Sequence, residues 1–483
     1  MSTLKEKTAK GLGWGFVDNF VGTGVTAAVS IILARILSPE EFGLVGMIAI
    51  FISLGSSLMD SGFSGALIRK KEATDADLST VFYTNLVLGL VIYLILFFSA
   101  PAIAAFLNNR TLIPLLRVLS LSVVIISFTQ VQKVNFIRKI DFRTQAIISL
   151  AASLVSAVAS IWMALKGCGV WSLVVQQLSK QVVVSLLLWV FSNWKPSLLF
   201  SFRSFKEMFS FGSRLLACSL ISVIWNEIYS LVIGKMYNPI AVGYFTRAEK
   251  FKTMVTSNIG QVVQRVGFPV MSSIQGDKQR QRRVYRKVAR LTTLLTSTLV
   301  LGLVGCADAM IEVLIGAKWL PASGYLRILG ISGMFLPLIL GSVNVFNANG
   351  KSEVTLRLEI IKTALAVIPV TLGIIFDIEA LLWGVVGVTL VSYLIHAGYV
   401  SREIQYPVLE QVADILPFVS VSAIMSVAVH LIGLIDIAPL PLLLLQICAG
   451  GVIVLLSYEF IYKAQEYSEL KGELLKMLHI RKS

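Results

Sequence analysis

The chain is built from apolar segments that are each long enough to cross a lipid bilayer. A transmembrane helix needs about 20 mostly apolar residues. Only 14% of the 483 residues are charged and 56% are hydrophobic, whereas soluble domains have about 25% charged residues. We therefore expect an all-α polytopic membrane protein with about 14 transmembrane helices. The segments cover residues 14–34, 42–65, 79–107, 111–131, 145–165, 168–192, 208–233, 241–273, 288–307, 325–346, 355–376, 379–400, 412–433 and 441–462.

Lysine and arginine are concentrated in alternate loops between these segments. Cytoplasmic loops of membrane proteins carry an excess of Lys and Arg, so the alternation predicts that both termini are cytoplasmic. The net charge of +15 follows from this excess and does not indicate nucleic-acid binding. Two of the predicted inner loops hold Arg69, Lys70 and Lys71, and Lys278, Arg280, Arg282, Arg283, Arg286, Lys287 and Arg290, whereas the predicted outer loops hold single residues: Arg35, Arg110, Lys166, Lys235 and Lys318.

The sequence contains no motif for covalent chemistry or for a cofactor. Its four cysteines form no CxxC pair, its three histidines are scattered, and it has no nucleotide-binding P-loop. We expect no metal site, no cofactor and no enzymatic activity. The basic segment from Gln275 to Arg290 is expected to be helical, either as an anchor on anionic lipid or as a gate or partner contact.

An internal repeat joins two distant parts of the chain. Residues 31–44, IILARILSPEEFGL, align without gaps with residues 231–244, LVIGKMYNPIAVGY. In both copies an apolar helix ends, and a Ser or Asn followed by Pro begins the next helix, which is a favourable helix start. The aligned pairs are Arg35 and Lys235, Ser38 and Asn238, Pro39 and Pro239, and Gly43 and Gly243.

The spacing of the repeat predicts the organisation of the domains. Six predicted helices separate the two copies, so the copies share one orientation in the membrane. We expect two parallel six-helix lobes, residues 1–204 and 205–403, followed by two additional helices and a basic cytoplasmic tail in residues 404–483. Transporters built in this way place the substrate path between the lobes and alternate its access by rocking.

Three stretches carry a resemblance to a known family. ARILSPEEFGLVGMIAIF and DSGFSGALIRKK resemble the start of the bacterial polysaccharide flippases, the Wzx/WzxC-like exporters, and GYFTRAEKF resembles the start of their second lobe. The resemblance covers essentially the whole chain. It implies the multidrug/oligosaccharidyl-lipid/polysaccharide exporter fold in the bacterial inner membrane. It also implies an oligosaccharide on undecaprenyl pyrophosphate as the substrate, and polysaccharide polymerase or chain-length machinery as partners. A monomer is the default expectation.

Cationic side chains in predicted helices 7 and 8 are candidates for binding such an anionic head group, because arginine holds phosphate through two hydrogen bonds at once. The alternative is that the outer charges lie at the lipid headgroups, since residues 241–273 span about 50 Å, more than the ~30 Å hydrocarbon core. Arg214 can likewise reach the interface by extending its side chain. The candidates are Arg247, Lys250, Gln261 and Arg265 on one helical face, Asn258 beside it, and Arg214 in helix 7.

Three acidic residues are candidates for cavity or coupling carboxylates: Asp18, Asp60 and Glu227. Glu227 lies in the middle of a predicted span, where an ionisable group is expensive unless it faces a polar interior. Asp18 occupies the first predicted helix and could bind a proton or cation. Asp60 lies near the inner end of the second helix, within reach of Arg69.

Three functional hypotheses can be weighed against this sequence pattern. A flippase for lipid-linked oligosaccharides fits the many cationic side chains. A cation-coupled multidrug or metabolite antiporter of the same fold fits the buried carboxylates. A membrane-embedded polymerase or glycosyltransferase fits poorly, because the sequence shows neither a sizeable loop domain nor a metal-binding DxD motif.

Overall fold

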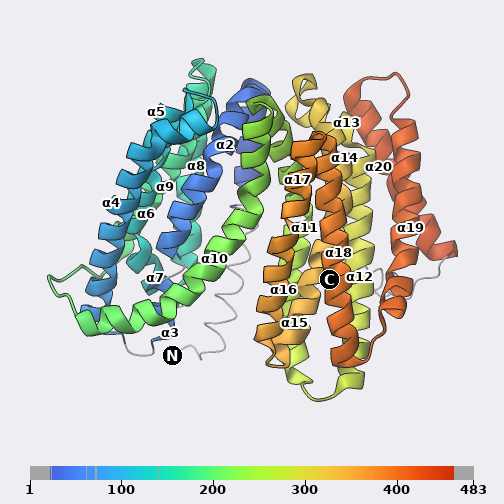
Figure 1. Cartoon of the computed structure of the whole chain (residues 1–483). Helices are drawn as coiled ribbons and strands as arrows, with labels where there is room; N and C mark the ends of the chain where they lie inside the picture. Colours follow the sequence, from blue (N-terminus) through green and yellow to red (C-terminus); the bar gives the residue numbers. More distant parts are fainter. Residues whose placement is uncertain (1–21, 23, 61–62, 71–72, 140, 462–483) are drawn as a thin grey trace, which may run out of the picture. The chain divides into compact units, whose positions relative to one another are not determined.

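Every regular element in the described part of the chain is a helix. The computed structural model describes residues 22, 24–60, 63–70, 73–139 and 141–461 (Figure 1). The chain divides into two compact units, Met1–Gly243 and Tyr244–Ser483. The predicted lobe boundary after residue 204 precedes this division, which falls after α10 (Phe202–Met236), because α10 packs along α2 (Pro39–Asp60) and α3 (Phe63–Arg69). The predicted six-helix lobes stay a prediction.

The first unit contains the helix Gly24–Ile36, then α2 and α3, and ends with α10. Its helices α5 and α6 form one stretch, Leu112–Ser127, which is bent by 43° against α7. Phe82 is the centre of an aromatic cluster that contacts Phe128, Trp189 and Trp194. The intervening helices are α4 (Asp75–Phe106), α5 (Leu112–Leu119), α6 (Leu121–Ser127), α7 (Gln130–Arg138), α8 (Phe142–Leu165) and α9 (Trp171–Phe191).

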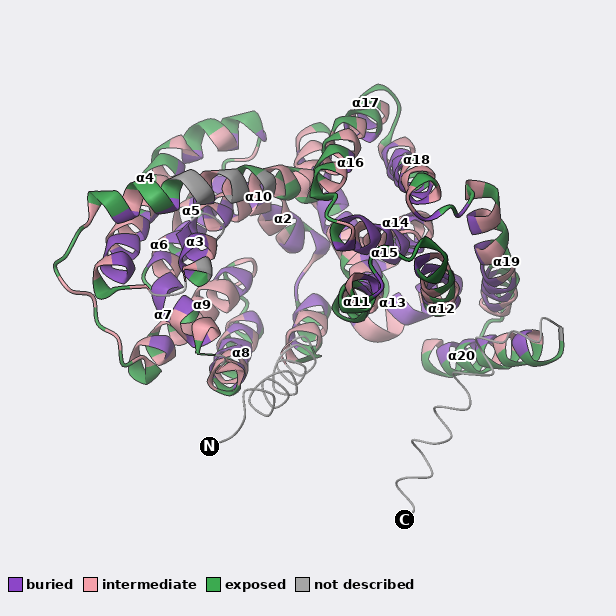
Figure 2. Cartoon of the chain, turned by 90° about the horizontal axis from the view of Figure 1, so that it is seen from below, coloured by how far each residue is buried: buried purple, intermediate pink, exposed green. Residues whose placement is uncertain are grey.

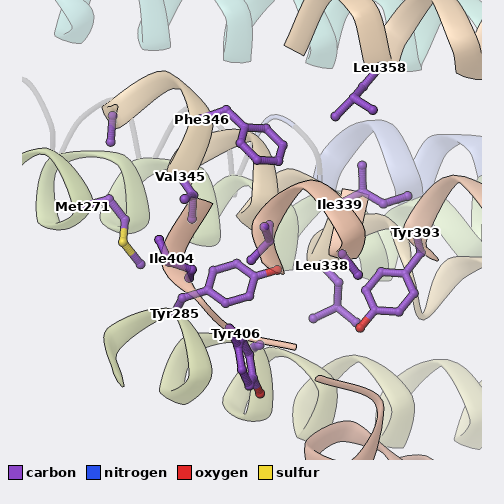
Figure 3. Close-up of a cluster of buried hydrophobic side chains, with 14 of the residues drawn as sticks. Met271, Tyr285, Leu338, Ile339, Val345, Phe346, Leu358, Tyr393, Ile404 and Tyr406 are labelled. Carbon is purple, nitrogen blue, oxygen red and sulfur yellow. The ribbon is translucent and has the colours of Figure 1, made fainter. Parts of the chain in front are cut away.

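The second unit begins within α11 (Pro239–Ser273) and contains the remaining helices. A buried cluster joins α11, α12, α15, α16 and α18 (Figure 3). The hydroxyl of Tyr285, a member of this cluster, shares a 3.0 Å hydrogen bond with the Ser342 hydroxyl. The helices are α12 (Lys278–Gly305), α13 (Ala307–Ile315), the 3-10 turn Ala317–Trp319, α14 (Pro321–Gly333), α15 (Leu336–Ala348), α16 (Ser352–Leu365), α17 (Val367–Ile375), α18 (Ile378–Ile404), α19 (Val408–Ile432), α20 (Pro439–Leu456) and the π-helical turn Ser457–Ile461.

The membrane architecture predicted from the sequence is confirmed. Among the described residues, ten helical stretches are long and apolar enough to span a bilayer, and the bent stretch Leu112–Arg138 gives an eleventh. Predicted helices 7 and 8 correspond to α10 and α11, which have 35 residues each and are not among these stretches. Residues 14–21 and 23 of the first predicted helix lie outside the described residues, so fourteen stays a predicted count. Exposed apolar residues cover much of α20 (Figure 2), as expected of a lipid-facing helix.

The two copies of the internal repeat begin α2 and α11 as predicted. The amide of Glu41 donates to the Ser38 hydroxyl at 3.4 Å, and the amide of Ala241 donates to the Asn238 side chain at 2.8 Å. Both caps satisfy amides that the first turn of a helix leaves without a partner. Proline follows each cap at the first helical position, where its missing N–H costs nothing.

Candidate functional site

Helix α11 has two chemically different faces. One face is buried against α14 and α15, where Val263 accepts a 2.9 Å hydrogen bond at its carbonyl oxygen from the Asn344 amide. Glycines allow this close approach: a Cβ on Gly260 or on Gly267 would lie 2.7 Å from Leu340 or from Asn344 respectively. The other face is exposed and carries polar and cationic side chains between apolar ones: Lys250, Ser257, Asn258, Gln264 and Arg265, with Val262 and Val266.

Helix α11 is longer than the hydrocarbon core of a bilayer is deep. At 1.5 Å per residue α11 is about 52 Å long, so a ~30 Å hydrocarbon core covers roughly its middle twenty residues. Ser257 falls near the middle of this stretch, Lys250 falls about one turn inside one edge, and Arg247 and Arg265 fall close to its two edges. Polar side chains at this depth are stable against water or other polar groups and not against lipid tails. The exposed face of α11 is therefore suited to contact with water or with a polar ligand, and not with lipid tails.

Arg247 lies at one end of this face, beside an aromatic group. Its guanidinium carbon is 5.8 Å from the centre of the Trp319 ring, within the range of a cation–π contact. Tyr244 packs edge-on against the same ring at 6.2 Å and donates a 3.4 Å hydrogen bond to the carbonyl of Lys318. Trp319 is fully buried, so it holds Arg247 in place and offers no ring face to a ligand.

The other candidates on α11 differ in exposure. Arg265 is exposed, Gln261 is half-buried, and the exposed Asn258 donates a 2.7 Å hydrogen bond back to the carbonyl of Met254. The carboxylate of Glu249 lies 2.7 Å from the ammonium group of Lys252, which is 4% exposed. Lys252 stands two positions after Lys250, about 200° round the helix, and packs against Gly333 of α14.

Glu227 lies in a polar seam between α10 and α2 within the first unit. Its carboxylate accepts a 3.5 Å hydrogen bond from the hydroxyl of Ser53. Further along the seam the hydroxyls of Ser57 and Ser219 are 2.5 Å apart. The half-buried carboxylate thus has one neutral donor and a position in the middle of a long helix.

Three predicted site residues cannot be placed as side chains. Asp18 lies outside the described residues. Asp60 is the last residue of α2 and Arg214 lies within α10, and the side chains of both are outside the described part of the structure. Their assignment to the site rests on the sequence. Among the described residues no group of three or more His, Cys, Asp or Glu side chains could hold a metal ion.

A cation that was not predicted from the sequence lies in the middle of α9. Lys180 is half-buried there, and three half-buried glutamines surround it in the sequence: Gln176, Gln177 and Gln181. One lysine among 21 mostly apolar residues does not disturb the apolar character of a span, so a search for spans passes over it. The signal that identifies it is the spacing of four polar residues at helical intervals.

The basic segment expected in residues 275–290 forms the start of α12 and pairs with α19. Arg282 lies 2.5 Å from Glu410, and Arg286 lies 2.6 Å from Asp414. Tyr406, in the connection before α19, donates a hydrogen bond to Asp414. Burial, reinforced by this hydrogen bond, raises the pKa of Tyr406 above its ordinary value. The segment therefore holds two helices of the second unit together.

Comparison with known proteins identifies the family. The family model described as "Polysaccharide biosynthesis protein" matches residues 32–324, more than half of the chain. The chain belongs to this family. The match includes α2 to α10, α11 with its exposed polar face, and the start of α14.

Characterised relatives of this polysaccharide biosynthesis protein extend over most of its length. The succinoglycan biosynthesis transport protein ExoT of Rhizobium meliloti is 26% identical over 485 residues, covering 99% of this chain and 97% of ExoT. The teichuronic acid biosynthesis protein TuaB of Bacillus subtilis is 25% identical and covers 73% of this chain and 74% of TuaB. The lipopolysaccharide biosynthesis protein WzxC of Escherichia coli is 24% identical and covers 80% of this chain and 78% of WzxC.

Solved structures share the fold of this family member. The lipid II flippase MurJ, in an inward closed conformation, superposes with a TM-score of 0.75 at 15% identity, covering 94% of this chain and 99% of MurJ. An inward-facing multidrug resistance transporter of the MATE family superposes with a TM-score of 0.62 at 18% identity, covering 80% of this chain and 94% of the transporter. The exporter fold expected from the sequence is confirmed.

Proposed function

We propose that the chain is a flippase that carries undecaprenyl-pyrophosphate-linked oligosaccharide repeat units across the bacterial inner membrane for surface polysaccharide synthesis. The observation that carries the proposal is the exposed polar face of α11, with Lys250 inside the stretch that a hydrocarbon core would cover and Arg265 at its edge. Membership of a polysaccharide biosynthesis family and the transport function in the name of ExoT support it. Movement of the substrate requires no covalent step.

In this proposal the anionic head group passes along α11 while the polyprenyl tail stays in lipid. Lys250, Arg247 and Arg265 bind the pyrophosphate, since guanidinium and ammonium groups replace the water that phosphate loses. Gln261 and Asn258 bind the sugar hydroxyls, and Arg214 in α10 is a further candidate cation for the head group. Access alternates between the leaflets as two lobes rock against each other. Both termini are cytoplasmic, the working unit is a monomer, and polysaccharide polymerase or chain-length machinery receives the product.

A second candidate is a cation-coupled antiporter for drugs or metabolites. The observation that favours it is the carboxylate of Glu227, which is half-buried between α10 and α2 with Ser53 as its donor. Such a group can take up a proton or cation during transport. Asp18 and Asp60 would join it in this role. The same carboxylates fit a coupled flippase, so the substrate decides between the two candidates.

The deciding experiment locates the lipid-linked oligosaccharide in a strain that lacks the gene. Membrane vesicles of defined orientation are treated with a glycosidase or lectin that cannot cross the membrane. We expect the oligosaccharide to accumulate on the cytoplasmic leaflet and the intact gene to relieve this accumulation. Normal leaflet distribution together with increased sensitivity to cationic drugs would favour the antiporter instead.

A further inference from the structure

Helix α9 carries a compact polar group halfway through the membrane. It spans Trp171–Phe191, and Lys180 stands nine residues from its start and eleven from its end. At 1.5 Å per residue the lysine is about 14 Å from one end and about 17 Å from the other, close to the centre of a ~30 Å core. Gln176, Gln177 and Gln181 lie within one turn of it. A lysine at this depth is costly against lipid and usually faces a polar interior.

The polar group faces away from lipid. Val182, Leu186 and Val190 follow one another at four-residue steps and are 41%, 61% and 75% exposed, which marks the lipid-facing side of α9. Gln177 lies about 140° or more round the helix from all three of these residues, and Lys180 lies about 160° from Val182, about 120° from Leu186 and about 80° from Val190. Both are half-buried, with Gln177 opposite the lipid-facing side and Lys180 between that side and Gln177.

The protein around α9 is polar as well. Its closest neighbour is α8, which buries Ser153, Ser156 and Ser160 at 3%, 3% and 0% exposure. Ser156 and Ser160 donate hydrogen bonds to carbonyls of their own helix. The Ser153 hydroxyl is buried without a hydrogen-bond partner among the described residues. An unsatisfied hydroxyl costs about 1–3 kcal/mol, so a further polar group is expected beside it.

We propose that the polar face of α9 is a carbohydrate subsite that takes sugar hydroxyls and one negative charge. Each glutamine amide offers both a donor and an acceptor, which suits hydroxyl groups, and the lysine ammonium is a compact single charge. This inference rests on the proposed function and adds a second binding position, in the first unit. The negative charge belongs either to a carboxylate of the glycan or to the pyrophosphate that links it to the lipid.

Cysteine labelling tests the subsite without requiring transport. In a background with all four native cysteines replaced, Lys180→Cys is compared with Leu186→Cys on the lipid-facing side of the same helix. The probe is an anionic methanethiosulfonate, which reacts with thiolates in contact with water. We expect Lys180→Cys to react about tenfold faster than Leu186→Cys, because thiols in hydrocarbon stay protonated. Gln177→Cys gives the same comparison if Lys180→Cys does not reach the membrane.

Protection by small ligands then identifies the source of the charge. The protection assay uses Gln177→Cys, which keeps the Lys180 ammonium in place, and glucuronate, inorganic pyrophosphate and glucose are each added at equal concentration before the probe. Slower labelling with glucuronate assigns the charge to a glycan carboxylate, and slower labelling with pyrophosphate assigns it to the linkage; glucose is the neutral control. Labelling no faster than that of Leu186→Cys, or labelling that neither anion slows, would overturn the subsite. Protection in a chain that fails the leaflet experiment would reject the proposed substrate and keep the anion site.

Discussion

Gly43 lies directly against the carbonyl group of Pro239, and Gly243 lies against the carbonyl group of Pro39 in the same way. A Cβ on Gly43 would stand 1.6 Å from the Pro239 oxygen, and a Cβ on Gly243 would stand 2.1 Å from the Pro39 oxygen. The two copies of the internal repeat thus contact each other reciprocally at the starts of α2 and α11. Each copy supplies the glycine that makes room for the proline of the other.

We predict that Gly43→Ala or Gly243→Ala lowers the stability of the protein by about 1–3 kcal/mol, the usual cost of overpacking a tight contact. The added methyl group meets backbone atoms, which cannot rotate away as a side chain can. The measurement is the thermal unfolding of the purified protein in detergent. Gly387→Ala in α18 is the control, because nothing lies within 4 Å of its Cβ position. Equal melting temperatures for Gly43→Ala and the control would show that the contact is not tight.

Removing two cations from α11 should reduce transport and leave the fold intact. We expect Arg247→Ala combined with Lys250→Ala to lower export of the lipid-linked oligosaccharide about tenfold or more, since a hydrogen bond to a charged group contributes about 1.5–3 kcal/mol. Export is measured in the deletion strain at matched membrane levels of protein. The control, Arg280→Ala with Arg283→Ala, removes the same charge from the exposed start of α12. Unchanged export in the α11 variant would mean that its cations only contact headgroups.

Glu227→Gln tests whether the carboxylate between α10 and α2 titrates during transport. The amide keeps the size of the side chain and can still accept the hydrogen bond from Ser53. We expect normal insertion and a large loss of export, because an amide cannot take up a proton or compensate a cation. Glu379→Gln, at the exposed start of α18, provides the matched substitution. Full export by Glu227→Gln would limit Glu227 to a packing role.

Tyr406 contributes to the stability of the second unit, and this contribution is lost at alkaline pH. Its pKa is raised, mainly by burial and then by the hydrogen bond to Asp414. The protonated hydroxyl therefore stabilises the fold below about pH 10, the ordinary value for tyrosine, and this contribution is lost as the pH rises above 10. Tyr406→Phe should melt at a lower temperature than the intact chain at pH 8, with the difference shrinking towards pH 11. A difference that stays constant through pH 11 would contradict this account.

Local sequence patterns predicted the helices well where a helix start has its own chemistry. Ser38–Pro39 and Asn238–Pro239 begin α2 and α11 where they were expected. Length was a poorer guide to short elements. α13 has nine residues, too few to span a membrane, so the search for long apolar segments left Ala307–Ile315 partly in a connection. The bend of 43° before α7 could not be predicted in this way, because the break contains no proline or glycine.

The candidate site was predictable in composition and less so in detail. The charges of α11 were expected as a string, yet Lys252 turns into the packed interface with α14 while Lys250 stays exposed. Which of two nearby lysines is buried depends on the neighbouring helix, and the sequence of α11 does not contain that information. Lys180 was missed for a related reason. A span is recognised by the mean hydropathy of its residues, and one charged residue changes that mean very little.

The pairing of α12 with α19 has a consequence for the biogenesis of the protein. Arg282 and Glu410, like Arg286 and Asp414, are separated by 128 residues. A nascent chain that has inserted α12 must therefore wait for six more helices, α13 to α18, before its arginines meet their carboxylates. Any chain that stops short of residue 410 keeps these cations without those partners. The helices synthesised last thus complete the second unit. A product truncated before residue 410 lacks both ion pairs between α12 and α19.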